Sequence, residues 1–430
     1  MQKLREPAED ARRIYDALKE KRPVLFYRGL TVSALLADRP CLTLSDVWLP
    51  DERKHRAMRA RGIPESDITG NGSDFDKVKA FLACLPQMVG SAIPEAVMAD
   101  LIALGGCEES FRESSGELWH RGAEYLAKEP LHPSDRFRAA RGALVGCTIE
   151  ELPLLVGATL PARPVLMMGA LADPTSPQFL KSLQTVAEMQ GISICDLATL
   201  TVALTKLVDT AAACGCRGAL ADYSTLSAFV RPNPYGAEQA LLARLQGQAC
   251  DGAALLLLRA QIERILGQAY AKNGFFLIAD LPAATECPTY SFSVAAFDAL
   301  LQYLQSCNGF VRTLLRHAAA DLPAGLATLL GKFAKEDGTP QLMFGISGIG
   351  ATREALARAI AFYLEAGCGS ALVGIAEDDI HYITAYAREN FATALAAHLG
   401  ENNAPFGYYM AGEYAAAIHA DNAAAFFGFH

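Results

Sequence analysis

Acidic residues follow four of the short apolar runs in this chain, at the places where buried strands would end. They are Glu150, Glu151, Asp222, Asp280, Asp378 and Asp379. Carboxylates at the carboxyl ends of parallel strands can bind a hard cation such as Mg²⁺ or transfer protons. The alternative is structural, because Asp and Glu also cap the helices that follow strands. We predict Asp378, Asp379 and Asp280 as catalytic candidates, and Asp222 and Glu150 as substrate-binding candidates.

A glycine-rich turn over residues 345–350 offers a different chemistry. Glycines let backbone N–H groups approach an anion, and a helix N-terminus favours negative charge. Ser347, Gly348 and Gly350 are therefore candidates for binding a substrate phosphate. The turn has neither the Lys-Ser/Thr ending of a P-loop nor the glycine spacing of a dinucleotide site. The alternative is a tight turn in which Thr352 caps the next helix.

Metal binding through histidine has little support in the sequence. The chain has 8 histidines but no His-x-His or His-x-x-x-His pair, although catalytic metals are commonly bound by several imidazoles held on rigid elements. His381 is kept as a substrate-binding candidate because it follows Asp378 closely. Arg28 is the one obvious positive group at a strand end, where it could pair with Asp378 and take the place of a cation.

These residues need strands to position them, and the apolar runs supply eight. The expected strands are 24–27, 143–147, 164–168, 218–221, 275–279, 310–315, 341–346 and 371–375. Amphipathic stretches lie between them, at 179–189, 197–213, 237–246, 253–271 and 352–366. Repeated β-then-α order predicts an α/β fold with a parallel sheet, and this many strands favour closure into a (β/α)8 barrel. Another helix is expected at 7–21, where Ala11, Ile14, Tyr15 and Leu18 share one face.

Residues 33–128 show a helical and irregular pattern without a convincing strand. We predict a single barrel over residues 1–430, with residues 33–128 as a helical insertion after the first strand. Single barrels with insertions reach this length. The alanine-rich segment 415–417 and the aromatic residues 426–429 would pack either at a subunit contact of a homo-oligomer or over the base of the barrel.

Several segments, in order, resemble uronate isomerases. The first are Leu44–Leu49 and Arg56–Arg59, and others are Gly215–Arg217 and Val373–Asp378. Shorter pieces of the resemblance, over nearly the full length, are 68–70, 73–77, 117–119, 177–180, 191–197 and 270–275. The resemblance implies a metal-dependent barrel of the amidohydrolase superfamily that interconverts aldose and ketose sugar acids. It also implies a divalent metal (Zn²⁺, Mn²⁺ or Mg²⁺), and the residues indicate no other cofactor.

Carried over position by position, the resemblance implies a changed site. Arg28 stands where the first metal-binding histidine is expected, and Leu30 or a deletion replaces the second. The expected carboxylate-binding arginine falls near Gly169, and the expected Asp-His pair becomes Leu220-Ala221. A tryptophan pair expected after the seventh strand is missing from the turn at 345–350. Of the three metal ligands considered, Asp378 is retained.

The composition of the chain limits the classes of molecule that it is expected to bind. The chain has 430 residues, a formal charge of −9 and 51% hydrophobic residues. An acidic chain does not favour nucleic acid or an anionic membrane as partner, and no apolar run is long enough to span a bilayer. The first ten residues lack a secretory signal, and 11 scattered cysteines fit buried thiols in a reducing compartment, so we predict a cytoplasmic protein.

Three functions remain open at this point, all with a small-molecule ligand. The first is isomerisation of D-glucuronate or D-galacturonate through an enediol, with an aspartate as base and Arg28 as the positive charge. The second is a catalytically silent homologue that binds a ligand through the same scaffold. The third is a barrel enzyme that acts on a phosphorylated sugar held by the turn at 345–350.

Overall fold

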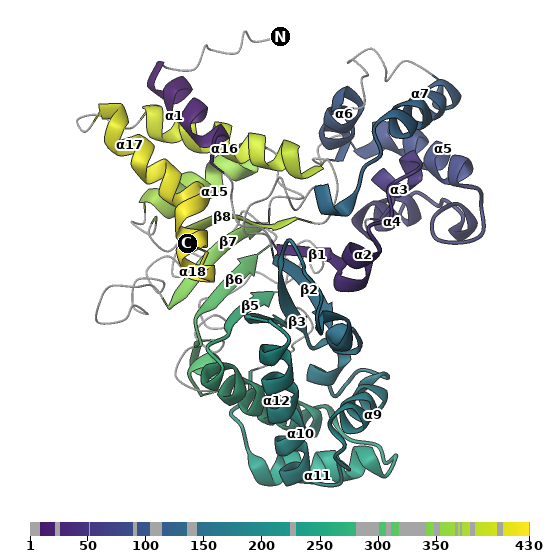
Figure 1. Cartoon of the computed structure of the whole chain (residues 1–430), viewed down its shortest axis with the longest axis vertical. Coiled ribbons are helices and arrows are strands. Elements are labelled where there is room, and N and C mark those ends of the chain that lie inside the picture. Colours follow the sequence, from purple (N-terminus) through teal and green to yellow (C-terminus); the bar gives the residue numbers. More distant parts are fainter. Residues whose placement is uncertain are drawn as a thin grey trace. The chain divides into compact units, whose positions relative to one another are not determined.

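The structure is a computed structural model of the chain (Figure 1). It describes residues 9–21, 26–50, 52–88, 93–103, 114–135, 144–223, 229–280, 301–306, 311–317, 341–347, 353–365, 369, 372–378, 383–401 and 407–429. In the described ranges, no helix is long and apolar enough to cross a membrane.

Eight strands follow one another in chain order around a closed barrel, as the apolar runs predicted. They are β1 Phe26–Thr31, β2 Leu144–Thr148, β3 Arg163–Met167, β4 Gly218–Asp222, β5 Phe276–Asp280, β6 Thr313–His317, β7 Leu342–Ser347 and β8 Leu372–Asp378. The strands pair in parallel from β2 through β6 and between β8 and β1. The sixth strand begins three residues later than predicted. It also ends later, and its buried residues include Arg316.

The chain forms two compact units, and the second holds most of the sheet. Unit 1 comprises residues 1–143, 346–362 and 374–424, and unit 2 comprises 144–345, 363–373 and 425–430. The long helices of unit 2 are α9 Phe179–Gln190, α10 Leu197–Ala213, α11 Pro234–Leu245 and α12 Gly252–Lys272. They lie together in Figure 1, with α11 packed against α12. All four were predicted to within a few residues.

Local signals explain where these helices begin. Asp196 caps α10 by accepting a hydrogen bond from Thr199 N at 2.7 Å, and Asp251 caps α12 by accepting one from Ala254 N. Such caps satisfy backbone N–H groups that have no partner inside the helix. At the other end of α10, Gly215 has φ +96 and turns the chain into β4.

The two faces of β5 have different neighbours. Side chains alternate along a strand, so Phe276, Ile278 and Asp280 share one face while Leu277 and Ala279 share the other. Phe276 packs against the aromatic end of the chain, with its ring centroid 4.8 Å from that of Phe427. Leu277 instead lines a pocket beside α12. The Phe276 face is therefore the barrel interior, and the Leu277 face lies toward the helices.

The base of unit 2 is closed by residues 426–429. Phe426 and Phe427 are 4% and 2% exposed, and their rings meet with centroids 5.1 Å apart. Arg163, the first residue of β3, donates hydrogen bonds to the carbonyl oxygens of Phe427 at 3.3 Å and Gly428 at 2.9 Å. Its guanidinium carbon also lies 4.0 Å from the ring centroid of Phe429. In this chain the aromatic segment covers the barrel base, one of its two expected positions.

A glycine at the start of β4 makes room for this aromatic cluster. A Cβ at Gly218 would overlap the Phe276 ring. We expect Gly218→Ala to lower the free energy of unfolding by about 1–3 kcal/mol, because the ring is held from behind and overpacking forces strain. Urea denaturation followed by circular dichroism measures the change. Gly116→Ala in α7 is the matched control, because a Cβ there would meet only Ser114 Oγ at 3.9 Å, an ordinary contact. A loss as large there would contradict the explanation.

Helices make up most of the described chain between β1 and β2. They are α2 Val32–Ala37, α3 Leu44–Trp48, α4 Glu52–Arg59, α5 Asp74–Cys84, α6 Ile93–Ala103 and α7 Ser115–Lys128. Their core is built around Trp48, whose Nε1 donates to Asp100 Oδ2 at 3.1 Å. The buried Lys54 donates to the Trp48 carbonyl oxygen at 2.7 Å. The single-domain boundaries 1–430 and 33–128 stay predictions.

The remaining helices of unit 1 pack around α1 Glu9–Lys19, which buries Ala11, Ile14 and Leu18 as predicted. It lies against α16 Ile383–Glu401 and α17 Gly407–Ala416 (Figure 1). Gly400 allows the close approach, because a Cβ there would clash with the backbone of Ala11. Two further helices are α15 Arg353–Glu365, which precedes β8, and α18 Asn422–Phe427, the last α-helix in the sequence.

The described cysteines are free thiols, in agreement with the sequence expectation. Cys147 and Cys216 are buried and Cys214 is half-buried. A hydrogen bond with Cys216, together with burial, raises the pKa of the Cys147 thiol. A raised pKa keeps a thiol protonated and unreactive, so Cys147 acts as a small apolar group in the core.

Candidate functional site at the carboxyl ends of the strands

Three charged residues lie in one row across the carboxyl ends of β4, β5 and β6. The register pairs Asp222 with Asp280, and Asp280 with Arg316. Register partners in a parallel sheet share a face, so all three belong to the interior face that also carries Phe276. This is the end of a (β/α)8 barrel at which ligands bind. Two of the three, Asp222 and Asp280, were predicted from the sequence.

Asp280 and Arg316 form a buried ion pair. Asp280 is 8% exposed and Arg316 is 3% exposed. Arg316 Nε donates to Asp280 Oδ1 at 2.7 Å, and Nη2 makes a second short contact with the same oxygen. A carboxylate held by a guanidinium is stabilised in its charged form, which makes it a weak base. Arg316 therefore holds the Asp280 carboxylate in place, and the catalytic role of Asp280 stays a prediction.

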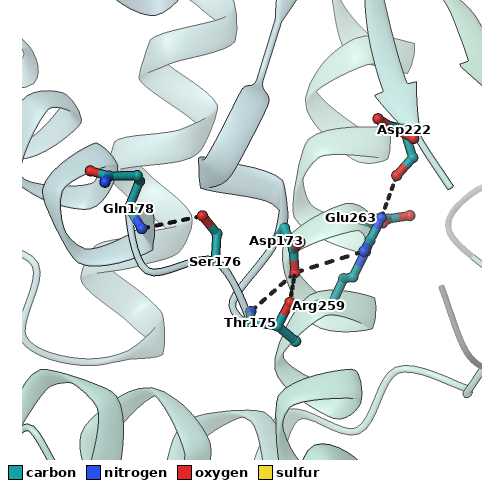
Figure 2. Close-up of polar contacts among 7 residues, drawn as sticks. All are labelled: Asp173, Thr175, Ser176, Gln178, Asp222, Arg259 and Glu263. Carbon is teal, nitrogen blue, oxygen red and sulfur yellow. Dashed lines mark hydrogen bonds and ion pairs between the residues drawn. The ribbon is translucent and has the colours of Figure 1, made fainter. Parts of the chain in front are cut away.

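Asp222 differs from Asp280 because it is exposed. Its backbone carbonyl oxygen accepts a hydrogen bond from Arg259 Nη2 on α12, which fixes the end of β4 (Figure 2). The next residue, Tyr223, packs edge-on against Phe229 and Tyr303, with both centroid distances 6.2 Å. The backbone at Asp222 is thus held firmly while its carboxylate reaches solvent, as a group that binds ligand hydroxyls would.

At the end of β2, the two adjacent glutamates have different surroundings. Glu151 is buried, and its Oε2 accepts a hydrogen bond from Thr148 N at 2.9 Å in a capping box for the 3₁₀ helix Ile149–Leu155. The structural alternative, helix capping, therefore holds for Glu151. Glu150 is exposed, and its role as a substrate-binding candidate stays a prediction.

In unit 1, the register of β1 and β8 places two further candidates near each other. Tyr27 is the partner of Asp378, and Phe26 is the partner of Glu377. Arg28 is the next residue of β1, so Tyr27 and not Arg28 is the register partner of Asp378. Ser347 is the last residue of β7. The side chains of these three residues lie outside the described part of the structure, as do Gly348, Gly350, Asp379 and His381 entirely.

The structure adds charged residues that the sequence patterns did not identify. Arg259 and Glu263 lie one turn apart on α12, with Arg259 Nε 3.1 Å from Glu263 Oε1. Arg259 Nη1 also lies 3.8 Å from Asp173 Oδ1, whose oxygen accepts from Thr175 N and Oγ1 (Figure 2). The sequence did contain a signal for this pair, which is an arginine and a glutamate spaced i, i+4 on a largely apolar helix. Charged residues are buried mainly when they are paired.

The residues at the strand ends do not fit the metal that the resemblance implies. By the resemblance, Arg28 stands where the first metal-binding histidine is expected, and Leu30 or a deletion replaces the second. Among the described residues, no three His, Cys, Asp or Glu side chains are grouped to hold an ion. A guanidinium and an aliphatic side chain donate no lone pair to a metal. In unit 2, Arg316 places a positive charge beside Asp280 at the carboxyl end of β6.

Comparison with known proteins agrees with the segments noted in the sequence. The model of the glucuronate isomerase family matches residues 4–427. The chain is 26% identical to a uronate isomerase of Streptococcus pneumoniae over 97% of both chains, and 23% identical to one of Marinomonas over 98% of this chain and 97% of that protein.

Solved structures show the same fold. The chain is similar to a uronate isomerase of Thermotoga maritima, with a TM-score of 0.82, 15% identity and coverage of 98% of this chain and 97% of that one. A glucuronate isomerase of Caulobacter crescentus gives a TM-score of 0.77, 14% identity and coverage of 99% and 95%. The family model matches nearly the whole sequence. This (β/α)8 chain therefore belongs to the glucuronate isomerase family.

Proposed function

We propose that this chain binds an open-chain sugar acid at the carboxyl ends of its strands and does not catalyse metal-dependent isomerisation. Family membership supports the substrate class. The donor set supports the second half of the proposal, because the resemblance puts Arg28 at the position of the first metal-binding histidine and Leu30 or a deletion at that of the second. A sugar-acid isomerase needs a base near C2 and a cation that stabilises developing negative charge.

The described side chains suit binding better than proton transfer. The exposed carboxylate of Asp222 can accept hydrogen bonds from sugar hydroxyl groups. Asp280 is tied to Arg316 and is therefore a poor base. Arg28 would supply positive charge for the carboxylate of the ligand, since arginine pairs readily with carboxylates. The assignments of Asp378 and Asp379 as bases and of His381 as a binding residue stay predictions that the experiment below also tests.

The first test separates binding from turnover. We expect purified protein to bind D-glucuronate or D-galacturonate in a calorimetric titration. The same protein should exchange no hydrogen at C2 in deuterated water, with or without Zn²⁺, Mn²⁺ or Mg²⁺. Arg28→Ala should weaken binding at least about tenfold, the equivalent of one charge-assisted contact, while Arg12→Ala on the exposed face of α1 should not.

Two results would contradict the proposal in different ways. If neither sugar acid binds, the ligand class is wrong. Exchange at C2 that disappears in Asp378→Asn would instead establish an active isomerase with a rebuilt site. Proton NMR detects exchange directly, and protein prepared from a host without its own uronate isomerase removes the main contaminant.

The effect of a chelator on the melting temperature provides a second test, independent of ligand binding and turnover. A ligand that binds the folded state raises its stability, so loss of a bound ion lowers the melting temperature. We expect dialysis against a chelator, and later addition of Zn²⁺ or Mn²⁺, to leave the melting temperature unchanged. Stoichiometric metal in the purified protein, measured by plasma mass spectrometry together with a chelator-induced fall in melting temperature, would overturn the argument from the donor set.

A further inference from the structure

Two charged residues on α12 hold the last residue of β4 and the one after it. Arg259 Nη2 donates to the backbone carbonyl oxygen of Asp222, and Arg259 Nε lies 3.1 Å from Glu263 Oε1 (Figure 2). The carboxylate of Glu263 also interacts with the hydroxyl group of Tyr223, the residue that follows Asp222. On the neighbouring strand, the carbonyl oxygen of Asp280 accepts a hydrogen bond from Tyr223 N at 2.9 Å. Helix α12 therefore contacts two consecutive residues at this strand end.

The same arginine also reaches the segment that follows β3, the strand next to β4. Arg259 Nη1 lies 3.8 Å from Asp173 Oδ1. That oxygen accepts hydrogen bonds from Thr175 N at 3.0 Å and from Thr175 Oγ1 at 2.6 Å (Figure 2). One guanidinium thus joins the carboxyl ends of two neighbouring strands, because its planar fork presents donors in several directions. A lysine, whose charge lies on a single atom, could not contact all these partners together.

The buried pair is costly for the fold alone. Arg259 and Glu263 are 5% and 9% exposed, and the attraction of two buried charges often fails to offset the cost of removing them from water. Most other buried residues of α12 are apolar, among them Leu258, Ile262 and Leu266. An apolar pair would therefore pack this helix as well, but it could not hold the end of β4 or the segment after β3.

We propose that Arg259 is a positioning residue of the site at the carboxyl ends of the strands, where it directs the Asp222 carboxylate toward a bound ligand. The inference rests on the proposed function, in which the exposed carboxylate of Asp222 accepts hydrogen bonds from sugar hydroxyl groups. Arg259 holds the backbone of Asp222 and so fixes the point from which this carboxylate extends. Glu263 keeps the guanidinium oriented before the ligand arrives.

The test replaces the charged pair without leaving one partner charged. In the double variant Arg259→Met with Glu263→Gln, both residues are neutral and Tyr223 keeps a polar partner on α12. We expect about the same melting temperature as in the native protein, while the Kd for D-glucuronate or D-galacturonate rises at least about tenfold. Arg264→Met, at another arginine of α12, is the matched control and should leave the Kd unchanged.

A double-mutant cycle distinguishes positioning from a general loss of structure. Asp222→Ala should weaken binding at least about tenfold in the native protein, but less than about twofold once the pair is replaced, because the pair acts through Asp222. Equal weakening in both backgrounds, or native affinity in the double variant, would overturn the proposal. If the double variant does not fold, Arg259→Lys is judged by the same criteria, since lysine keeps the charge and reaches fewer partners.

A measurement without ligand separates this inference from the proposed function. If the native protein binds neither sugar acid, the proposed function fails, and amide hydrogen exchange decides whether the pair holds the end of β4. The Tyr223 amide should exchange at least about tenfold faster in the double variant. The Leu277 amide, which donates to the carbonyl oxygen of Arg312 at 2.8 Å, should not change. Unchanged exchange at Tyr223 would refute the positioning role of Arg259.

Discussion

Replacement of Phe427 by alanine is expected to lower the free energy of unfolding by about 3–5 kcal/mol, the usual cost of emptying a buried aromatic site. Phe427 is 2% exposed and contacts both Phe276 and Phe426. Its removal leaves a cavity at the barrel base that the surrounding strands cannot fill without losing their register. Because most domains are stable by only about 5–15 kcal/mol, this one change removes a large part of the total.

Urea denaturation followed by far-ultraviolet circular dichroism measures the loss. Both tryptophans, Trp48 and Trp119, lie in the insertion helices of unit 1, so tryptophan fluorescence reports separately on that unit. Tyr409→Ala is the control for loss of an aromatic ring, because Tyr409 is 67% exposed. Equal losses in the two variants would show that Phe427 does not form part of the core.

The second large effect is expected at the ion pair between Asp280 and Arg316. Asp280→Asn should lower the free energy of unfolding by about 3–5 kcal/mol, since it leaves a buried guanidinium without its countercharge. The double variant Asp280→Leu with Arg316→Met should regain most of that stability. Replacement of a buried pair by apolar groups avoids the cost of removing two charges from water.

An exposed ion pair serves as the control for the buried pair of Asp280 and Arg316. Asp16 and Lys19 are about half exposed and 2.6 Å apart, and exposed pairs contribute little, so Asp16→Asn should leave the melting temperature unchanged. A double Asp280/Arg316 variant as unstable as Asp280→Asn would show that these residues have further structural roles. If the stable double variant also fails to bind the sugar acid, the pair is required for the ligand and not for the fold.

The sequence predicted the order of strands and helices well because both depend on local pattern. Apolar runs such as 144–147 end in turn or charged residues, and α10 matched its predicted bounds of 197–213. The sixth strand was placed too early because Arg316 looks like a polar residue beyond a strand end. Its burial depends on Asp280, which lies 36 positions earlier in the chain.

The candidate site was predicted less completely, because it depends on the register of neighbouring strands and on side chains from other elements. The acidic residues after strands were correct as positions, yet sequence alone could not distinguish the helix cap Glu151 from the paired Asp280 and the exposed Asp222. These roles follow from which strand lies alongside, and by how many residues it is offset. Arg259 and Glu263 were missed for the same reason, since their partners lie on other elements.

The aromatic base of unit 2 also bears on how the protein is made. Phe276 and Arg163 meet Phe426 to Phe429 across more than a hundred residues of intervening chain. During synthesis, strands β2 to β6 therefore emerge from the ribosome with their lower apolar ends uncovered until the aromatic segment follows. Exposed apolar ends attract chaperones and promote aggregation of incomplete chains. A ribosome-stalled chain ending at residue 420 should thus be cleaved by protease within unit 2 far faster than one in which residues 425–429 have cleared the exit tunnel.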